Sequence, residues 1–558
     1  MWDSLNLLSP RIKNAVLFLN KNRWQAAITC FYLLSVSFFL FQLFSHWAYD
    51  DPFITYRYAY NLSHGYGFVY NPGERVLSTT TPLFAILLAA LSSLTPNLPQ
   101  LANLVGAFSL ALGGLFIWLL ARSWEAPWIG WAGLLLYPTF PLVVSTLGSE
   151  TPLYLAFCLG AFAFYAAKRY PLAAVFSALA VLTRPDGALV PALLGLDYLL
   201  RHSKIRIPDR MRGFSQAVLH RPTEITTEAS PAGGSPWRAI LIFLCLTIPW
   251  FIFAWIYFGS PWPATLAAKQ HQGAMAVSQQ FAPGFLTIIK GYASSWFYWI
   301  EASLALFGAV FIAWRARRWL LFLSWTGLYF LAYTILGITR YYWYYAPLVP
   351  GFIVLVGSSI WALSGAWRTR HYLAPVEGQG QPSPGERHTI FLAASLLILL
   401  SVLQGSNLLR LQHNSDQRAA IYRAVGVWLQ GKTPPQARIG ALEVGIIGYY
   451  ARRPMVDFAG LIQPDIAAQL NVNTTYDDAA LWAANQYRPD YLVLNNGQFP
   501  MLQQGYLADN CQILKRFPGK GYGYPGSLLV YSCKLMVSGL NTLQSGLLIQ
   551  RNVGPNAI

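Results

Sequence analysis

The chain has 558 residues, of which 55% are hydrophobic and only 11% are charged, and its mean hydropathy is +0.38. Soluble domains carry about 25% charged residues, so this composition excludes an ordinary soluble protein and also a disordered one. Apolar runs of roughly 20 residues, the length that crosses a bilayer, are expected instead. The composition therefore predicts an α-helical polytopic membrane protein.

The net charge of +17 does not indicate a nucleic-acid surface, because the basic residues lie between apolar runs. The basic segment 1–24 is predicted to be cytoplasmic, since it flanks a first apolar run at 25–44. The run 82–94 is too short to cross a bilayer, and we interpret it as an interfacial or re-entrant helix. Most bases between the runs then fall on the cytoplasmic side: Arg122, Lys168, Arg169, those of segment 201–238, Arg315, Arg317, Arg318, Arg368, Arg370 and Arg387.

About 11 transmembrane helices follow from this reading. The predicted spans are 25–44, 101–121, 128–147, 151–167, 171–183, 187–200, 239–257, 292–314, 319–337, 346–365 and 389–409. They define a membrane domain at 25–410, with a first external loop at 45–100 and a further external loop at 258–290. The remainder, 411–558, is then predicted to lie outside the cytoplasm.

The C-terminal region 411–558 is predicted to be an α/β domain. Segments 437–442, 454–458 and 491–494 are typical of short strands, and 418–429 is typical of a helix. Cys511 and Cys533 also lie in this region, and a disulfide between them is permitted outside the cytoplasm. Two buried free thiols are the alternative.

Two adjacent carboxylates, Asp50 and Asp51, follow the first run where the bilayer gives way to water. Placing carboxylates at that depth is energetically unfavourable, so such residues usually have a functional role. The pair is therefore a candidate for a general base. Asp51 precedes Pro52, as an N-cap precedes a proline at the first helical position. We therefore expect Asp51 to cap a helix beginning near Phe53, which favours Asp50 as the base.

Isolated polar residues mark the other external turns, and each has a structural alternative. Glu150 could cap a helix, Arg184 could pair locally with Asp186, Lys269 could be a solvated loop lysine, and Arg340 could snorkel within an aromatic belt. A cation beside aromatic rings at the outer leaflet can equally hold a lipid phosphate. The candidates for a donor site are Arg57, Glu150, Arg184, Lys269, Arg340, Tyr341 and Tyr342.

The sequence contains none of the motifs that are typical of several other enzyme classes. It has no phosphate-binding glycine loop, no zinc-protease helix, no nucleophile elbow and no paired CxxC motif. No cofactor and no metal site are predicted, and the sequence leaves the need for a divalent cation open.

The first external loop carries a long motif that resembles the signature of GT-C glycosyltransferases. The matching segments are Asp50-Asp-Pro-Phe-Ile-Thr-Tyr-Arg-Tyr-Ala-Tyr-Asn-Leu62, Gly65-Tyr-Gly-Phe-Val-Tyr-Asn-Pro-Gly-Glu-Arg-Val76 and Thr81-Pro-Leu-Phe84. Within that superfamily they are most similar to the mycobacterial terminal arabinofuranosyltransferases and their bacterial relatives. Segments 148–154, 182–187 and 257–265 resemble later motifs in the same order, so the resemblance covers roughly residues 25–365.

This resemblance implies an inverting transferase at the outer face of the plasma membrane. The donor would be a polyprenyl-phosphate sugar, and the acceptor an extracytoplasmic glycan, lipid or protein. An aspartate of the first loop is the base in that family, and Asp50 and Asp51 are the matching positions. Pro52 and segment 78–81 depart from a common family form, which leaves the acceptor undefined.

Three other functions are alternatives to a glycosyltransferase. A transporter or flippase for lipid-linked sugars should show internal repeats and charges at the midplane of its spans, and the sequence shows neither clearly. A structural anchor needs only a single span. An oligosaccharide ligase or polymerase would use the same kind of site and lipid donor, and differs in moving a whole chain instead of one sugar.

Overall fold

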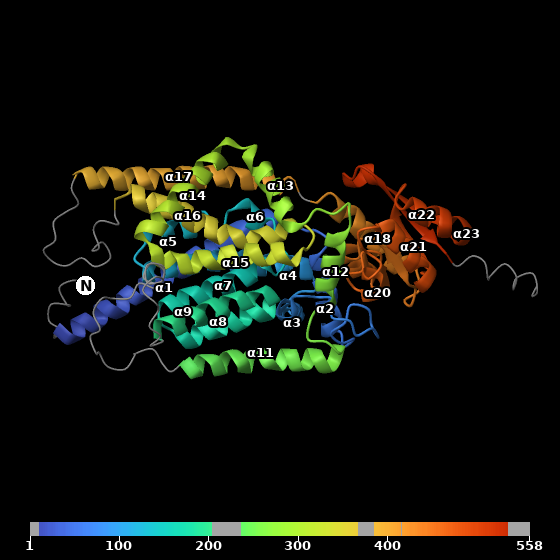
Figure 1. Cartoon of the computed structure of the whole chain (residues 1–558), viewed down its shortest axis with the longest axis horizontal. Helices are drawn as coiled ribbons and strands as arrows, with labels where there is room; N and C mark the ends of the chain where they lie inside the picture. Colours follow the sequence, from blue (N-terminus) through green and yellow to red (C-terminus); the bar gives the residue numbers. More distant parts are fainter. Residues whose placement is uncertain (1–9, 203–235, 366–383, 415, 534–558) are drawn as a thin grey trace, which may run out of the picture.

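The computed structural model describes residues 10–202, 236–365, 384–414 and 416–533. A bundle of long apolar helices forms one end of the molecule, and a small domain with a β-sheet forms the other (Figure 1). The bundle contains the elements up to Gln412, and the sheet domain begins at Arg418. The predicted fold class, a helical membrane protein with a C-terminal α/β domain, is confirmed.

Seven helical segments of the described chain are long and apolar enough to cross a membrane. The helices that form them are α1 (Pro10–Phe44), α4 (Leu98–Ser123), α11 (Pro236–Phe258), α14 (Trp296–Arg315), α15 (Leu320–Leu336) with η3 (Arg317–Trp319), α16 (Val349–Leu363) with η4 (Tyr342–Leu348), and α17 (Pro384–Gln412). Large apolar side chains such as Trp255 and Ile256 of α11 are exposed. Side chains of this kind are stable on a surface that faces lipid.

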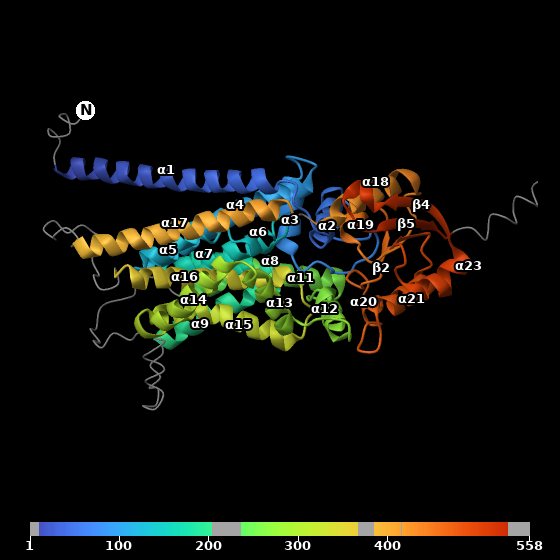
Figure 2. The same ribbon diagram turned by 90° about the horizontal axis from the view of Figure 1, so that it is seen from above.

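Shorter helices complete the bundle and correct part of the span prediction. The run 128–147 does not form one helix but two, α5 (Pro127–Leu135) and α6 (Pro141–Val144), because prolines 138 and 141 interrupt it. Helices α7 (Thr151–Ala166), α8 (Tyr170–Thr183) and α9 (Leu189–His202), the last two joined by η2 (Pro185–Ala188), have 16, 14 and 14 residues. Each is shorter than the ~20 residues of a typical span. Helix α7 packs against α4, α8 packs against α7, and α9 contacts α7 and α15 within the bundle (Figures 1 and 2).

The first loop, 45–100, and the second loop, 258–290, contain short helices where the bundle meets the sheet domain. In the first loop, α2 (Pro52–Ser63) packs against α3 (Pro82–Leu91), whose ten residues are roughly 15 Å long and cannot cross a bilayer. In the second loop, α12 (Ala264–Ala274) runs crosswise to the long helices, next to the sheet domain, and α13 (Phe281–Ala293) follows it (Figure 1).

The C-terminal domain contains a five-stranded sheet with the order β2-β1-β3-β5-β4. Strand β1 (Ile439–Ala441) pairs in parallel with β2 (Met455–Asp457) and β3 (Tyr491–Asn495), whereas β5 (Ser527–Ser532) is antiparallel to β3 and to β4 (Gln512–Pro518). The three predicted strands and the predicted helix are confirmed. Its helical segments are α18 (Arg418–Lys432), α19 (Gly445–Ala451), α20 (Pro464–Ala467), α21 (Tyr476–Tyr487), α22 (Pro500–Leu502), η5 (Gln503–Leu507), α23 (Ala508–Asn510) and η6 (Gly519–Tyr522).

One apolar core joins the first loop to this domain. Phe53 and Tyr56 of α2 belong to the same cluster of buried side chains as Ile421 of α18 and Ile446 of α19. Because burial of such side chains stabilises by about 1.5–3 kcal/mol each, the first loop is packed firmly onto the C-terminal domain.

A disulfide between Cys511 and Cys533 closes the segment that contains β4 and β5, so the predicted pairing is confirmed. The two cysteines are 22 residues apart. Closing a loop of this size in the unfolded chain stabilises a domain by roughly 3 kcal/mol.

Cys533→Ser is therefore expected to lower the free energy of unfolding of the C-terminal domain by roughly 3 kcal/mol. Denaturant melts monitored by limited proteolysis of the full-length protein measure the change. Cys245→Ser is the matched control, because Cys245 is a free, exposed cysteine on α11 and its replacement should not change stability. Quantitative alkylation of Cys511 and Cys533 in denatured, unreduced wild-type protein would contradict the bridge.

Candidate active site

The turn between α1 and α2 carries the acid pair, and other elements hold its backbone in place. The Asn103 side-chain amide of α4 donates to the carbonyl oxygens of Ser45 and Trp47, at 3.1 and 2.9 Å. The Trp47 indole N–H donates to the Ser145 carbonyl oxygen at 2.9 Å. The positions of Asp50 and Asp51 at the end of this turn are therefore fixed by contacts to the bundle.

Asp50 is buried and binds the C-terminal domain. Its carboxylate oxygens accept hydrogen bonds from the backbone N–H groups of Gly445, at 3.0 Å, and Ile446, at 2.7 Å, where α19 begins. Burial raises the pKa of Asp50, and the charge of Glu443 raises it further, while the two N–H donors oppose the shift. A buried carboxylate with both oxygens engaged is a poor base for a substrate hydroxyl.

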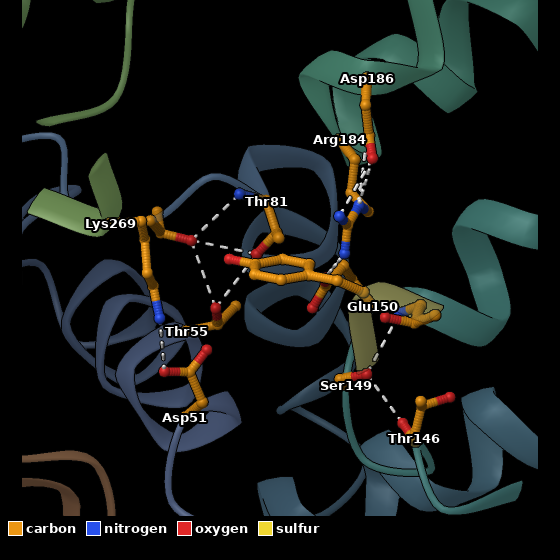
Figure 3. Close-up of polar contacts among 12 residues, drawn as sticks. Asp51, Thr55, Thr81, Thr146, Ser149, Glu150, Arg184, Asp186 and Lys269 are labelled. Atoms are coloured by element: carbon orange, nitrogen blue, oxygen red, sulfur yellow. Dashed lines mark hydrogen bonds and ion pairs between the residues drawn. The ribbon is translucent and has the colours of Figure 1, made fainter. Parts of the chain in front are cut away.

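Asp51 does not cap α2, so that prediction is wrong. Its side chain makes no capping hydrogen bond, and the residue itself has helical backbone angles. The preference for Asp50 rested on this cap and on the assumption that Asp50 lacks a partner. Both assumptions fail, because Asp50 binds α19 and Asp51 faces Lys269 instead (Figure 3).

Lys269 of α12 pairs with Asp51, with 3.6 Å between its Nζ and the Asp51 Oδ1. The Lys269 side chain is 8% exposed and that of Asp51 is 35% exposed, so the carboxylate remains accessible. The ammonium also lies 3.8 Å from the centre of the Tyr341 ring and 5.7 Å from that of Trp343. Burial alone lowers the pKa of Lys269, but the Asp51 charge and the Tyr341 ring outweigh burial, and the pKa is raised.

The Lys269 ammonium has unused hydrogen-bonding capacity. An ammonium group has three N–H donors, yet among the residues that the structure describes no acceptor lies within hydrogen-bond distance of this one. A buried cation in this condition is costly unless a further acceptor can reach it. The site therefore suits an anion that enters beside Asp51.

Helix α12 is itself held by the C-terminal domain. The ring Nδ1 of His271 lies 3.0 Å from the Leu470 carbonyl oxygen, and the Gln272 amide donates to the Ala459 carbonyl oxygen at 2.9 Å. Because Asp50 binds the same domain, one rigid unit fixes both the turn with Asp51 and the helix with Lys269.

Three threonine hydroxyls form a cluster on the first loop that the sequence reasoning missed. Thr55, Thr79 and Thr81 are linked by oxygen–oxygen distances of 3.2, 3.1 and 3.0 Å, close to the Asp51–Lys269 pair (Figure 3). Thr55 follows Asp51 by four residues, so the two share a helix face, which is the signal that could have identified it.

A buried ionic network surrounds Arg184. Its guanidinium donates to Glu150 at 3.0 Å, to both oxygens of Asp186 at 3.0–3.3 Å, and to the Tyr333 hydroxyl at 2.7 Å. Burial raises the pKa of Glu150, although the Arg184 charge opposes that shift. The local ion pair expected for Arg184 is present, while Glu150 makes no capping hydrogen bond. Most donors of Arg184 are thus already used.

The remaining candidates have other contacts. Arg57 is buried and donates to the backbone carbonyls of Tyr70 and Gly448, and so ties the first loop to α19. Arg340 is exposed and donates to the side chain of Gln279 at 2.6 Å.

Tyr341 lies beneath Lys269 and donates to Gln272, whereas the Tyr342 hydroxyl donates to the Ser145 carbonyl oxygen. Of these four residues, Tyr341 is the one in contact with the Asp51–Lys269 pair.

No group of three histidine, cysteine, aspartate or glutamate side chains gathers as metal ligands in the described part of the chain. The candidate active site contains the Asp51 carboxylate, the buried Lys269 ammonium, the rings of Tyr341 and Trp343, and the three threonine hydroxyls.

Comparisons with known proteins concern the fold. Residues 409–531 match a family described as a domain of unknown function, DUF8728. No curated protein matches the chain significantly. Among solved structures, the chain is similar to ArnT from Cupriavidus metallidurans bound to undecaprenyl phosphate, with 14% identity, a TM-score of 0.56, and coverage of 92% of this chain and 98% of that one.

Two further structures resemble the chain. ArnT from Cupriavidus metallidurans in the apo state gives a TM-score of 0.54 at 14% identity, covering 91% of this chain and 98% of that one. The oligosaccharyltransferase from Archaeoglobus fulgidus in the apo form gives 0.49 at 13% identity, covering 90% and 75%. The similarity to ArnT extends over nearly the whole of both chains, and the chain therefore shares the fold of ArnT.

Proposed function

We propose that the protein is an inverting membrane glycosyltransferase that moves a sugar from a polyprenyl-phosphate donor to an acceptor hydroxyl outside the cytoplasm. The observation that carries the proposal is the accessible Asp51 carboxylate beside the buried, hydrogen-bond-deficient Lys269 ammonium. The Asp51 carboxylate can accept a proton, and the Lys269 ammonium can bind a phosphate. The GT-C fold shared with ArnT, which has been solved with undecaprenyl phosphate bound, supports this choice of donor.

Asp51 acts as the general base in this mechanism. The acceptor oxygen attacks C1 of the donor sugar on the face opposite the phosphate, and its proton passes to the Asp51 carboxylate. As the new C–O bond forms, the bond between C1 and the phosphate oxygen breaks, and its electron pair leaves with the lipid phosphate. The configuration at C1 is therefore inverted.

Lys269 stabilises the leaving group. A lipid phosphate needs charge stabilisation and not a proton, and a preorganised ammonium in a site shielded from water provides it effectively. Tyr341 and Trp343 hold the ammonium in place. Without donor, Asp51 is its partner at 3.6 Å; a donor phosphate would take over that charge and release Asp51 for the acceptor.

Arg184 has a positioning role in this proposal. Its bonds to Glu150 and Asp186 connect the turn before α7 to the turn before α9. Because most of its donors are occupied, we assign the phosphate to Lys269 and the support of the surrounding turns to Arg184.

The proposal also includes the chemical class of the donor and the side of the membrane on which the site lies. The first-loop resemblance to terminal arabinofuranosyltransferases makes a pentosyl or hexosyl lipid phosphate the first donor class to test. The active site and the C-terminal domain are assigned to the outer face of the plasma membrane, where glycans of the cell envelope are accessible.

The first prediction separates the two aspartates. Asp51→Asn should lower turnover about 10²–10⁴-fold, the usual contribution of a general base, while the fold remains intact. Asp50→Asn should keep measurable turnover but lose stability, since an amide cannot accept both α19 N–H bonds, and such losses cost about 1–3 kcal/mol. Sugar transfer from a synthetic lipid-phosphate donor and thermal melts measure the two effects. Normal turnover of Asp51→Asn would reject Asp51 as the base.

The second prediction concerns the phosphate. A charge-assisted hydrogen bond to phosphate contributes roughly 1.5–3 kcal/mol, so Lys269→Ala should raise the KM for the donor about 10- to 100-fold, and Lys269→Arg should recover part of the loss. Lys290→Ala is the matched control, because Lys290 is an exposed lysine on α13. Equal donor KM values for the wild type and Lys269→Ala would place the phosphate elsewhere.

The third prediction concerns Arg184. Arg184→Gln would leave Glu150 and Asp186 without their cation, and breaking a buried ion pair in this way costs about 3–5 kcal/mol. The melting temperature of the purified protein should fall accordingly, whereas the donor KM of the folded fraction should change less than in Lys269→Ala. An unchanged melting temperature together with a strongly raised donor KM would show that Arg184 binds phosphate itself.

A further inference from the structure

A cavity of about 470 Å³ lies where the ends of α1 and α4 meet the C-terminal domain. Helices α18 and α19, beyond the ends of α1 and α4 in Figure 2, form its other side. Because α1 and α4 are both long and apolar enough to span a membrane, their ends mark a bilayer surface. The cavity therefore lies at the depth of lipid headgroups. On the bundle side it is lined by Ser45–Ala48, Pro96, Asn97, Pro99 and Gln100.

Two arginines give this cavity a positive charge. Arg423 of α18 and Arg452, which follows α19, both line it and are exposed. No ion pair found among the described residues includes either of them. The Asp416 carboxylate also lines the cavity, but Arg418 already engages it. Both guanidinium groups are therefore available to an anion, and their planar shape suits the oxygens of a phosphate.

The rest of the lining is typical of a membrane interface. Arg423 lies 5.3 Å from the centre of the Tyr450 ring, and Arg452 lies 4.4 Å from that of Tyr60. Trp47 contributes an indole ring to the wall. Tryptophan and tyrosine rings are enriched at the headgroup level of a bilayer, because they have an apolar body and a polar edge. Side-chain amides, which can donate to and accept from ester and glycerol oxygens, complete the wall: Asn97, Gln100 and Gln430.

Apolar surface lies directly below the cavity on the two spans. Helices α1 and α4 pack against each other, and Phe38 and Phe39 of α1 and Leu104 and Phe108 of α4 are exposed. With a rise of 1.5 Å per residue, Phe39 lies roughly 9 Å along the helix from residue 45, and Leu104 roughly 6 Å from residue 100. A ligand with a charged headgroup and acyl chains would therefore contact cations in the cavity and apolar side chains beneath it.

We propose that this cavity binds the headgroup of an anionic phospholipid and thereby ties the C-terminal domain to the bilayer surface. The phosphodiester oxygens accept hydrogen bonds from Arg423 and Arg452, and the acyl chains extend along α1 and α4. Neither α12 nor η4 contributes to the lining, so this lipid site is separate from Lys269. The inference does not depend on the proposed glycosyltransferase activity. A lipid is favoured over a free phosphate because the spans continue the site into the bilayer.

Native mass spectrometry of the full-length protein released from detergent tests this by counting bound lipids. The probes are phosphatidylglycerol and phosphatidylcholine with the same acyl chains, and inorganic phosphate serves as a competitor. The wild type should bind its first phosphatidylglycerol more tightly than phosphatidylcholine. Arg423→Gln and Arg452→Gln should each weaken that binding about fivefold, and the double variant about 25-fold, the usual effect of basic residues at an anionic bilayer surface.

Arg516→Gln is the matched control, because Arg516 is an exposed arginine on β4 outside the cavity. Melting temperatures in nanodiscs give a second readout, since a ligand that binds the folded state stabilises it. The wild type should melt at a higher temperature in phosphatidylglycerol than in phosphatidylcholine, and the double variant should lose this difference.

Three results would overturn the proposal. The first is equal binding of the two lipids to the wild type. The second is equal phosphatidylglycerol binding to the wild type and to both single variants. The third is displacement of phosphatidylglycerol by millimolar inorganic phosphate, which would assign the cavity to a free anion.

Discussion

The ion pair between Asp51 and Lys269 is the interaction on which the proposed chemistry depends. It joins the first loop to α12 and places a carboxylate, a cation and aromatic rings around one point. The Asp51 charge and Tyr341 outweigh the cost of burying the ammonium, but its N–H donors have no hydrogen-bond partner among the described residues. An ammonium with unused donors suits a site where a ligand anion can accept those hydrogen bonds.

The C-terminal domain gives this pair its geometry. It holds the turn of Asp51 through the Asp50 carboxylate and holds α12 through His271 and Gln272. A Cβ on Gly445 would lie 2.0 Å from the Asp50 carbonyl oxygen, so this close approach requires glycine. The C-terminal domain therefore fixes the position of Asp51 relative to Lys269.

Local sequence patterns predict most of the helices and strands. They do not predict contacts between residues that lie far apart in the sequence. Apolar runs and alternation located the long helices and β1–β3, but β4 is exposed along most of its length and carries no such pattern. The expected cap by Asp51 and the expected lack of a partner for Asp50 were both wrong, because the actual partners, Lys269 and Gly445, lie hundreds of residues further along the chain. A capping motif is a local signal, and here tertiary contacts override it.

The proposed mechanism requires Asp51 and the donor phosphate to compete for Lys269, and the affinity for undecaprenyl phosphate measures this competition. Asp51→Asn should bind this lipid severalfold more tightly than the wild type, because Lys269 is released from its partner. In a Lys269→Ala background, the same Asp51→Asn change should have little effect. Equal affinities of the wild type and Asp51→Asn, or the same gain with and without Lys269, would show that the two groups do not compete.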